Sequence, residues 1–189
     1  MAQPIAIYDA CVLYPAPLRD FLMQLALTDL FRAKWTERIH DEWIRSVLKN
    51  RPDLNKDQLE KTRRLMNTAT RDCLVEGYDA LIESVKLPDE DDRHVLAAAI
   101  HTRANLIVTF NLKDFPPKAL RPHKTEAIHP DDFVMGLVEM DSAAVCNAAH
   151  IHRARLRNPP KTVEEYLSTL SEYGLAKTVE HLRANSALL

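Results

Sequence analysis

The sequence has 189 residues and a formal net charge of −2, with 25 Lys and Arg against 27 Asp and Glu. This length allows one domain with a small appendage, and a chain of this size can bury roughly 70% of its unfolded surface. The charge excludes a generally basic coat for nucleic acid, although it is compatible with a local basic patch. Three cysteines lack the spacing of a zinc or redox motif, and no apolar stretch reaches the roughly 20 residues that span a bilayer. The N-terminus also lacks the basic region of a signal peptide, so we expect a soluble cytoplasmic protein.

The first part of the chain alternates one short apolar run with amphipathic segments. The predicted elements are a strand over 5–8, a helix from Pro17 to about Ala33, a helix over 37–50 capped by Thr36, and a helix over roughly 56–68. The strand is predicted because "IAIY" is apolar and short. Pro17 suits the first turn of the first helix, and Pro52 and Asn55 mark a break before the third.

The next part contains two further strands. Residues 69–86 have no clear pattern, with helix favoured around 78–85. We expect Asp89 to cap a helix over 90–103, because a short acidic side chain is typical of that position. The runs at 105–110 and 125–128 predict strands. Helices and strands alternate, so the sequence predicts an α/β fold with a central, mostly parallel sheet flanked by helices.

The character of the chain changes after Pro130. Residues 131–189 carry no strand signal, and Thr162 with Glu165 forms the pattern of a capping box. The predicted helices cover 131–140, 142–157 and 162–184, with a break at 158–160. We therefore divide the chain into a domain over 1–130 and a helical C-terminal extension over 131–189.

Polar side chains follow the two clearest strands. Asp9 comes directly after the first, and Thr109, Asn111 and Asp114 lie at or after the end of the strand over 105–110. Ligands gather at the carboxyl ends of parallel strands, so these residues are candidates for one site, in which we expect Thr109 and Asn111 to contact the substrate. Taken singly, each acid could also be one that starts a loop or a turn.

Two helical acids are expected to point inward. Glu42 lies at the edge of an apolar stripe that contains Ile39 and Trp43, and Asp92 precedes Val95 by three residues. A carboxylate on the buried side is costly without a partner, although Glu42 could still reach water at the boundary. Of the four acids over 89–92, only Asp92 has this position.

Together these acids predict a cation site. Two carboxylates about 4 Å apart repel by roughly 4 kcal/mol at an effective dielectric of 20, so a cluster requires protons or cations. Oxygen ligands favour Mg²⁺ or Mn²⁺ over zinc. A metal held in this way is suited to the hydrolysis of a phosphodiester.

Other chemistries have weaker support. No HExxH or His–Cys pattern is present. His94, two positions after Asp92, could face the site, but we favour a surface or capping role for it. Cys11 follows Asp9, but a thiol phosphatase would need an Arg where Pro17 stands. Arg153 and Arg157 share a helical face in the predicted extension, where they could follow a phosphate backbone or simply face solvent.

Three motifs together resemble the PIN-domain family, the fold of VapC-type toxin ribonucleases. They are "IAIYDACVLYP", "LPDEDDRHVLAAAI" and "LIVTFNLKDFP", and the similarity spans roughly residues 4–130. The resemblance implies a Mg²⁺- or Mn²⁺-dependent endoribonuclease, the toxin of a type II toxin–antitoxin pair, neutralised by a small antitoxin protein. It also implies that Asp9, Glu42 and Asp92 are metal ligands.

Several points stay open at this stage. Either Asn111 or Asp114 could complete the site, and the number of metal ions is undetermined. A non-catalytic RNA- or protein-binding module of the same fold, or a nuclease that acts on DNA, is the alternative function. The target RNA, the role of residues 131–189 and the oligomeric state, with a homodimer among the options, do not follow from the sequence.

Overall fold

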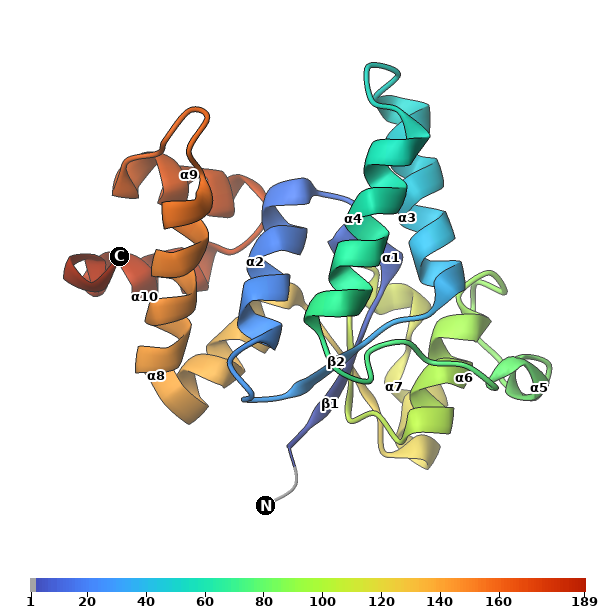
Figure 1. Ribbon diagram of the computed structural model, residues 1–189. Coiled ribbons are helices and arrows are strands. Elements are labelled where there is room, and N and C mark those ends of the chain that lie inside the picture. The colour runs from blue at the N-terminus through green and yellow to red at the C-terminus, as the bar shows by residue number, and fades with distance from the viewer. Residues whose placement is uncertain (1–2) are drawn as a thin grey trace. The chain divides into compact units, whose positions relative to one another are not determined.

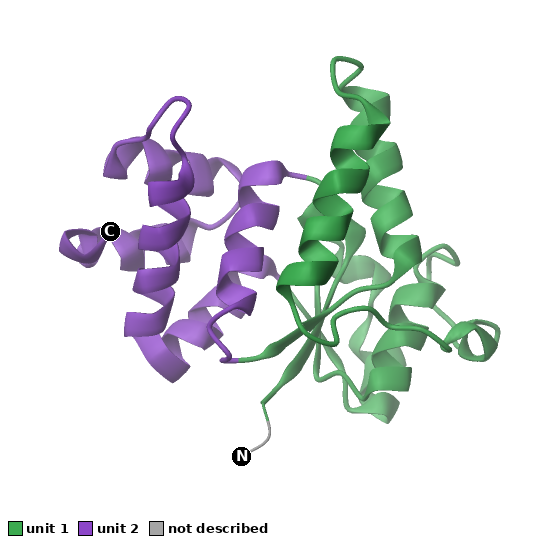
Figure 2. Cartoon of the chain, viewed as in Figure 1, with its two compact units in different colours: residues 1–14, 31–128 green, residues 15–30, 129–189 purple. Residues whose placement is uncertain are grey.

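The computed structural model describes residues 3–189, which form two compact units (Figure 2). Unit 1 contains the residues up to Tyr14 together with Phe31–Ile128. Unit 2 contains Pro15–Leu30 and His129–Leu189. The division of the sequence near residue 130 stays a prediction, but the segment 15–30 belongs to the helical unit although it lies early in the chain.

Within the described residues, four strands form one parallel sheet in unit 1, in the order β2-β1-β3-β4. The strands are β1 (Ile5–Tyr8), β2 (Arg32–Lys34), β3 (Leu106–Val108) and β4 (Glu126–Ile128). Ala6, Ile7 and Tyr8 of β1 are completely buried, as expected for a central parallel strand. The predicted α/β class with a parallel sheet and a helical C-terminal region is confirmed.

The strand order creates a crevice at one edge of the sheet. From β1 the chain continues to β2 on one side, whereas from β3 it continues to β4 on the other side. The two connections diverge between β1 and β3, and such a switch point is where ligands bind in open α/β sheets. Tyr8 pairs with Val108 at this edge, so the residues after the two strands emerge next to each other.

The helices of unit 1 are α1 (Ala10–Leu13), α3 (Glu37–Asn50), α4 (Lys56–Ala69), α5 (Asp79–Ile82), α6 (Arg93–Thr102) and α7 (Pro117–Leu120). Short 3₁₀ turns cover Leu112–Asp114 and Arg121–His123. The side chain of Thr36 accepts a hydrogen bond from the Ile39 amide, so the predicted cap of α3 is confirmed. Helix α6 packs against β1 and β3, and α3 runs beside α4 (Figure 1).

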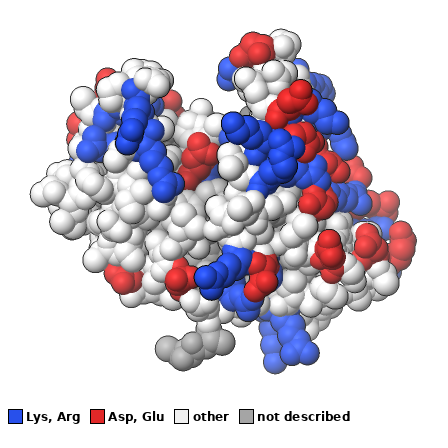
Figure 3. Space-filling model, viewed as in Figure 1, with Lys and Arg blue, Asp and Glu red and all other residues white. Residues whose placement is uncertain are grey.

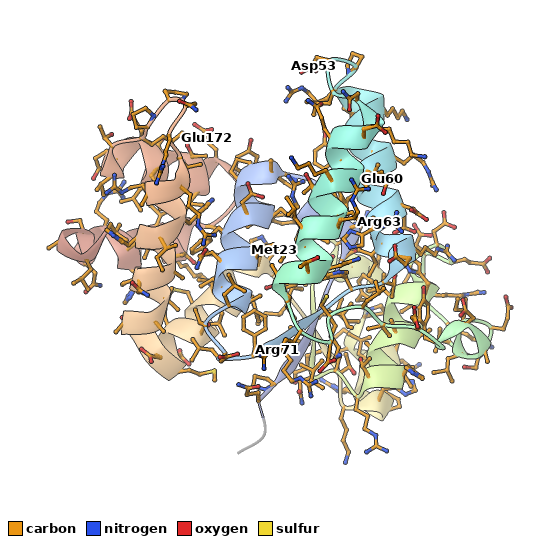
Figure 4. All side chains as sticks on the ribbon, in the orientation of Figure 1. Met23, Asp53, Glu60, Arg63, Arg71 and Glu172 are labelled. Atoms are coloured by element: carbon orange, nitrogen blue, oxygen red, sulfur yellow. The ribbon has the colours of Figure 1, made fainter. Side chains whose placement is uncertain are left out.

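Ion pairs join α3 to α4. Arg63 of α4 pairs with Glu37 and lies 2.9 Å from Asp41, both on α3. It also approaches Glu60 of its own helix at 3.5 Å (Figure 4). Figure 3 shows basic and acidic side chains mixed over these two helices rather than a surface of one sign.

The start of α6 differs from the prediction. The helix begins at Arg93 and not at Glu90, so Asp92 rather than Asp89 occupies the N-cap position. The Asp89 side chain instead accepts a 2.9 Å hydrogen bond from the Asp91 amide, which closes a turn before the helix. The prediction that Asp89 caps this helix is therefore wrong. Its short side chain bonds to the amide two residues later in the turn, and not to an amide of the helix.

Unit 2 consists of α2 (Ala16–Ala26), α8 (Pro130–Arg155), α9 (Val163–Glu172) and α10 (Ala176–Ala184), with a 3₁₀ turn at Ser186–Leu188. Helix α8 is bent at Asp141, where the two predicted helices were divided. The Thr162–Glu165 capping box is confirmed. The single helix predicted over 162–184 is wrong, because the chain turns at Gly174, whose φ of 84° is easily adopted only by glycine.

Helix α2 is shorter than predicted. It ends at Ala26, because Thr28 Oγ1 donates to the Leu25 carbonyl and Asp29 takes a left-handed conformation with φ 58°. The helix expected to reach about Ala33 is therefore wrong at its end, and the residues that follow enter strand β2.

A buried carboxylate connects two helices of unit 2. Asp131, near the start of α8, accepts hydrogen bonds from the amides of Lys177 and Thr178 and from the Thr178 hydroxyl, at 2.7–2.9 Å. These amides belong to the first turn of α10, where an acid is favourable. Across residues 3–189, no helix has the length and apolar character needed to cross a membrane.

Candidate active site

Asp9 occupies the carboxyl end of β1 and is held there by hydrogen bonds. Its Oδ1 accepts from the Ala10 amide at 2.7 Å, and its Oδ2 accepts from the Thr109 hydroxyl at 2.7 Å. The residue is only 4% exposed. Since both oxygens are bonded, the direction of the carboxylate is fixed before any ligand arrives.

Thr109 and Cys11 also hold the Asp9 carboxylate by hydrogen bonds. Thr109 is completely buried, and its hydroxyl also accepts from the Asn111 amide at 2.9 Å. Cys11 Sγ donates to Asp9 Oδ2 at 3.1 Å. Thr109, predicted to bind substrate, is thus placed to orient Asp9 and the chain after β3.

Glu42 lies on α3 at the edge of the predicted apolar stripe. Ile39, Trp43 and Val47 are buried, whereas the Glu42 side chain is 27% exposed. Its Oε1 lies 2.9 Å from Nε2 of His94 and 3.4 Å from Nε of Arg38. The helix therefore presents this carboxylate at the boundary between core and solvent.

Asp92 stands at the N-cap position of α6, and among the described residues its side chain makes no capping hydrogen bond. The pKa of Asp92 is raised from 3.8 to about 7, first by burial and then by the charges of four carboxylates: Asp9, Asp89, Asp114 and Glu42. A carboxylate with this pKa lies in a concentration of negative charge that favours a proton or a cation.

The chain after β3 brings Asn111 and Asp114 to the same region. Asn111 lines the same pocket as Asp9 and Asp92, and the negative charge of Asp114 raises the pKa of Asp92. A 3₁₀ turn over Leu112–Asp114 joins them, with the Asp114 amide donating to the Asn111 carbonyl. Both candidates for completing the acidic site are therefore close to it. Asn111 lines the pocket, and the charge of Asp114 acts on Asp92.

These residues surround one pocket of about 340 Å³ in unit 1. Its lining consists of Asp9, Ala10, Cys11, Tyr14, Glu42, Ser46, Asp92 and Asn111. A second hollow of about 490 Å³ shares Glu42 and Asp92 with it and is otherwise lined by Arg38, Asp41, Arg45 and Asp91. The three acids predicted as metal ligands, which come from β1, α3 and α6, thus face the same space.

The donor set suits a hard divalent cation. Carboxylate and amide oxygens are the ligands that Mg²⁺ prefers, and the pKa of Asp92 is raised by burial and then by the charges of nearby carboxylates. Among residues 3–189, no group of three His, Cys, Asp or Glu side chains lies close enough together to hold one metal ion. Repulsion between the carboxylates opposes closer approach without a cation. Binding would therefore require the Glu42 and Asp92 side chains to rotate, because hydrogen bonds hold both oxygens of Asp9.

Thiol chemistry has no support at this site. Burial, followed by the charge of Asp9, raises the pKa of Cys11 to about 12. A thiol with this pKa is protonated near neutral pH and is a weak nucleophile. The sequence-based rejection of a thiol phosphatase agrees with this environment.

The role favoured for His94 from the sequence does not hold. His94 is 1% exposed and contacts Glu42, so the interpretation as a surface or capping residue is wrong. His94 lies in the first turn of α6, and it is buried together with Val95. The partner, Glu42, lies 52 positions earlier in the chain, and no local pattern connects the two.

The two arginines predicted to bind substrate lie in unit 2 and have different environments. Helix α8 ends at Arg155, so Arg153 and Arg157 do not continue one helical face. Arg153 donates to the carbonyls of Lys161 at 2.9 Å and Leu189 at 3.1 Å. Arg157 is exposed in the loop that follows.

Comparison with known families agrees with this geometry. The family model described as "PIN domain" matches residues 6–113, more than half of the chain. The chain belongs to the PIN-domain family. A second model, described as "VapC50 C-terminal domain", matches residues 130–184, so the resemblance to VapC-like proteins with a helical C-terminal extension is confirmed.

One curated relative was found among known proteins. It is named "Putative ribonuclease VapC50", from Mycobacterium tuberculosis (strain ATCC 25618 / H37Rv), and is 40% identical over 96 residues. The matched region covers 51% of this chain and 56% of the relative, so it spans little more than half of that protein. No solved structure matches the chain.

Proposed function

We propose that this protein is a metal-dependent endoribonuclease and the toxin of a type II toxin–antitoxin pair. The observation that carries the proposal is the convergence of Asp9, Glu42, Asp92 and Asn111 on one pocket at the switch point of a PIN-domain sheet. The name of the curated relative, a ribonuclease, supports RNA as the substrate.

The residues have distinct roles in this proposal. Asp9, Glu42 and Asp92 would hold Mg²⁺ or Mn²⁺. The bound ion would lower the pKa of a water molecule and stabilise negative charge on the phosphate. Asp9 supplies a ligand in a fixed direction, because Thr109 and the Ala10 amide hold both of its oxygens. Asp92 must lose its proton before it can take part.

The outer residues would orient the substrate. The Asn111 amide can donate to a phosphate oxygen or to the attacking water, and Asp114 adds negative charge that strengthens the attraction for a cation. Arg45 is exposed in the adjoining hollow, where its guanidinium can pair with a phosphate next to the cleaved bond. Of the two arginines predicted to bind substrate, Arg157 is exposed and stays a candidate for RNA contact in unit 2.

The antitoxin would neutralise the same pocket. A surplus of carboxylates attracts Arg or Lys, and the planar guanidinium of Arg pairs with them especially well. We expect a short amphipathic partner segment that inserts such a cation. An inhibitory complex in which the partner leaves the acidic pocket open to RNA would contradict this mode of inhibition.

A cleavage assay tests the function. The full chain is incubated with RNA and DNA oligonucleotides of the same sequence, with Mg²⁺, with Mn²⁺ or with EDTA. We expect RNA cleavage that requires the metal and is lost in Asp9→Asn, while the exposed control Asp53→Asn in the loop between α3 and α4 cleaves normally (Figure 4). Cleavage of DNA alone would make the protein a DNA nuclease, and metal-dependent RNA binding without cleavage would make it a binding module.

A further inference from the structure

We propose that His94 is a positioning residue that orients Glu42 as a metal ligand. This inference rests on the proposed metal-dependent function, because it concerns how one ligand is held. It adds to the acidic set a buried imidazole that neither the PIN-domain match nor the relative's name assigns.

The first support is the contact itself. His94 Nε2 lies 2.9 Å from Glu42 Oε1, and the His94 side chain has no exposed surface. A carboxylate can only accept at this distance, so Nε2 must carry the proton that faces it. The alignment is imperfect, because neither ring nitrogen has a well-directed hydrogen bond among the described residues. A small rotation of the Glu42 carboxylate would correct it.

The second support is that the two oxygens of the Glu42 carboxylate have different surroundings. His94 and Arg38 both contact Oε1, and within the described part of the chain no partner is found for Oε2. One oxygen is therefore anchored to protein, and the other can face a cation in the pocket that Glu42 lines. Carboxylate ligands are commonly oriented by hydrogen bonds of this kind, whose loss weakens metal binding about 10- to 100-fold.

The third support is the placement of His94 in the fold. The start of α6 provides both Asp92, at the N-cap position, and His94 two residues later. Asp92 lines the pocket, whereas His94 reaches α3 at Glu42. The same helical turn thus supplies one predicted ligand and fixes a second. Arg38 does not have this role to the same degree, because its side chain is 44% exposed and exposed pairs are weak.

The experiment measures binding of Mn²⁺ alone to the full chain by calorimetry and by electron paramagnetic resonance, without RNA. His94→Phe keeps a ring in the core but removes the donor. His94→Gln places an amide N–H the same number of bonds from the backbone as Nε2, whereas His94→Asn is too short to reach Glu42. We expect about 10- to 100-fold weaker Mn²⁺ binding in the Phe and Asn variants and near-normal binding in the Gln variant.

Two controls distinguish orientation from packing. Arg38→Ala should change the affinity less than threefold, or strengthen it slightly, because it removes a cation near the site. In a Glu42→Ala background, His94→Phe should cause no further loss, since a residue that acts through Glu42 has nothing left to orient. Equal melting temperatures for the Gln and Asn variants would exclude a stability effect as the cause of their difference.

The outcomes separate the two proposals. If the unmodified protein does not bind Mn²⁺, the proposed metal-dependent function fails, and this inference fails with it. If the unmodified protein binds Mn²⁺ but His94→Phe binds it equally well, the metal site stands and the positioning role is overturned. Rescue by Asn as good as rescue by Gln would also overturn it.

Discussion

The hydroxyl of Thr109 donates a 2.7 Å hydrogen bond to Oδ2 of Asp9 and so joins the carboxyl ends of β3 and β1. The two residues are 100 positions apart in the sequence. Because both are buried, this bond fixes the direction of the carboxylate from inside the protein and leaves its solvent side to the pocket.

Thr109→Val should therefore damage both stability and metal binding. The substitution keeps the shape but removes the donor to Asp9 and the acceptor for the Asn111 amide. We expect a loss of roughly 1–3 kcal/mol in the free energy of unfolding, measured with urea, and weaker Mn²⁺ binding. Thr109→Ser, which keeps the hydroxyl, should lose much less of both. Equal behaviour of the two variants would show that the hydroxyl is unimportant.

Asp92→Asn and Asp91→Asn should differ sharply. Asp92 lines the pocket among the other carboxylates, whereas Asp91 is exposed in the turn before α6. Asp92→Asn should abolish metal-dependent RNA cleavage and raise the melting temperature of the metal-free protein, because it removes repulsion. Asp91→Asn should leave cleavage nearly unchanged. A dead Asp91→Asn enzyme, or an active Asp92→Asn enzyme, would contradict the assignment of Asp92 as a ligand.

The pKa of Asp92 also predicts a pH dependence. Burial and neighbouring carboxylates raise it from its ordinary value of 3.8 to about 7. Protons compete with the metal for this carboxylate, so the affinity for Mn²⁺ should rise with pH up to about 7 and then level off. The folded state binds this proton more tightly than the unfolded chain, so at this group the metal-free protein loses stability as the pH rises from about 4 to about 7. Calorimetric titrations between pH 5.5 and pH 8, compared with Asp91→Asn, check the first expectation; a flat affinity over this range would contradict it.

Local sequence patterns predicted the parts of the fold that depend on local physics. Three of the four strands of the described sheet follow from short apolar runs, and the caps at Thr36 and Thr162 follow from side chains that bond to nearby amides. Strand β2 was missed, because Arg32–Lys34 is short, has a charged residue at each end and is defined by its pairing with β1.

The acids of the candidate site could be predicted from the sequence, but the residues that hold these acids in place could not. An acid after a buried strand, or on the edge of an apolar stripe, is visible in a sequence. The contact of His94 with Glu42 and that of Thr109 with Asp9 depend on tertiary packing, and neither has a local signal. The role of Asp89 was mistaken because the same side chain can cap a turn or a helix, and the position where α6 starts decides between them.

His152 predicts a separate sensitivity of unit 2 to acid. It is 5% exposed, stacks on Phe21 and lies 3.0 Å from the Tyr166 hydroxyl. Burial, and then the charge of Arg155, lowers the pKa of His152 from 6.5 to about 4. The unfolded chain therefore takes up the proton more readily, so stability falls as the pH drops below about 6.5, and the loss is complete below about pH 4.

Below about pH 4, this lowering of the His152 pKa reduces the free energy of unfolding by about 3 kcal/mol relative to neutral pH. Urea unfolding at pH 7.5, 6 and 5 should show the decline in the unmodified protein relative to His152→Gln, which cannot take up this proton. Because the variant retains the other titrating groups, including Asp92, the difference between the two proteins isolates His152. Parallel pH profiles would contradict the prediction.

Arg153 and Arg157 should separate a structural role from an RNA-binding role. The guanidinium of Arg153 donates to the carbonyls of Lys161 and Leu189, so Arg153→Ala should lower the free energy of unfolding by roughly 1–3 kcal/mol. Arg157 is exposed, so Arg157→Ala should leave the melting temperature unchanged. If Arg157 contacts a phosphate, this variant should bind RNA more weakly, and the slope of log affinity against log salt should decrease by about 1.

Fluorescence anisotropy with a labelled RNA at several KCl concentrations measures this slope, in an Asp9→Asn background that does not cut the RNA. Arg157→Lys keeps the charge and should restore most of the affinity, because a phosphate contact in solvent depends mainly on charge. An unchanged salt slope in Arg157→Ala would remove Arg157 from the RNA-binding surface. An unchanged stability in Arg153→Ala would show that its two carbonyl contacts are not needed to hold the C-terminal helices.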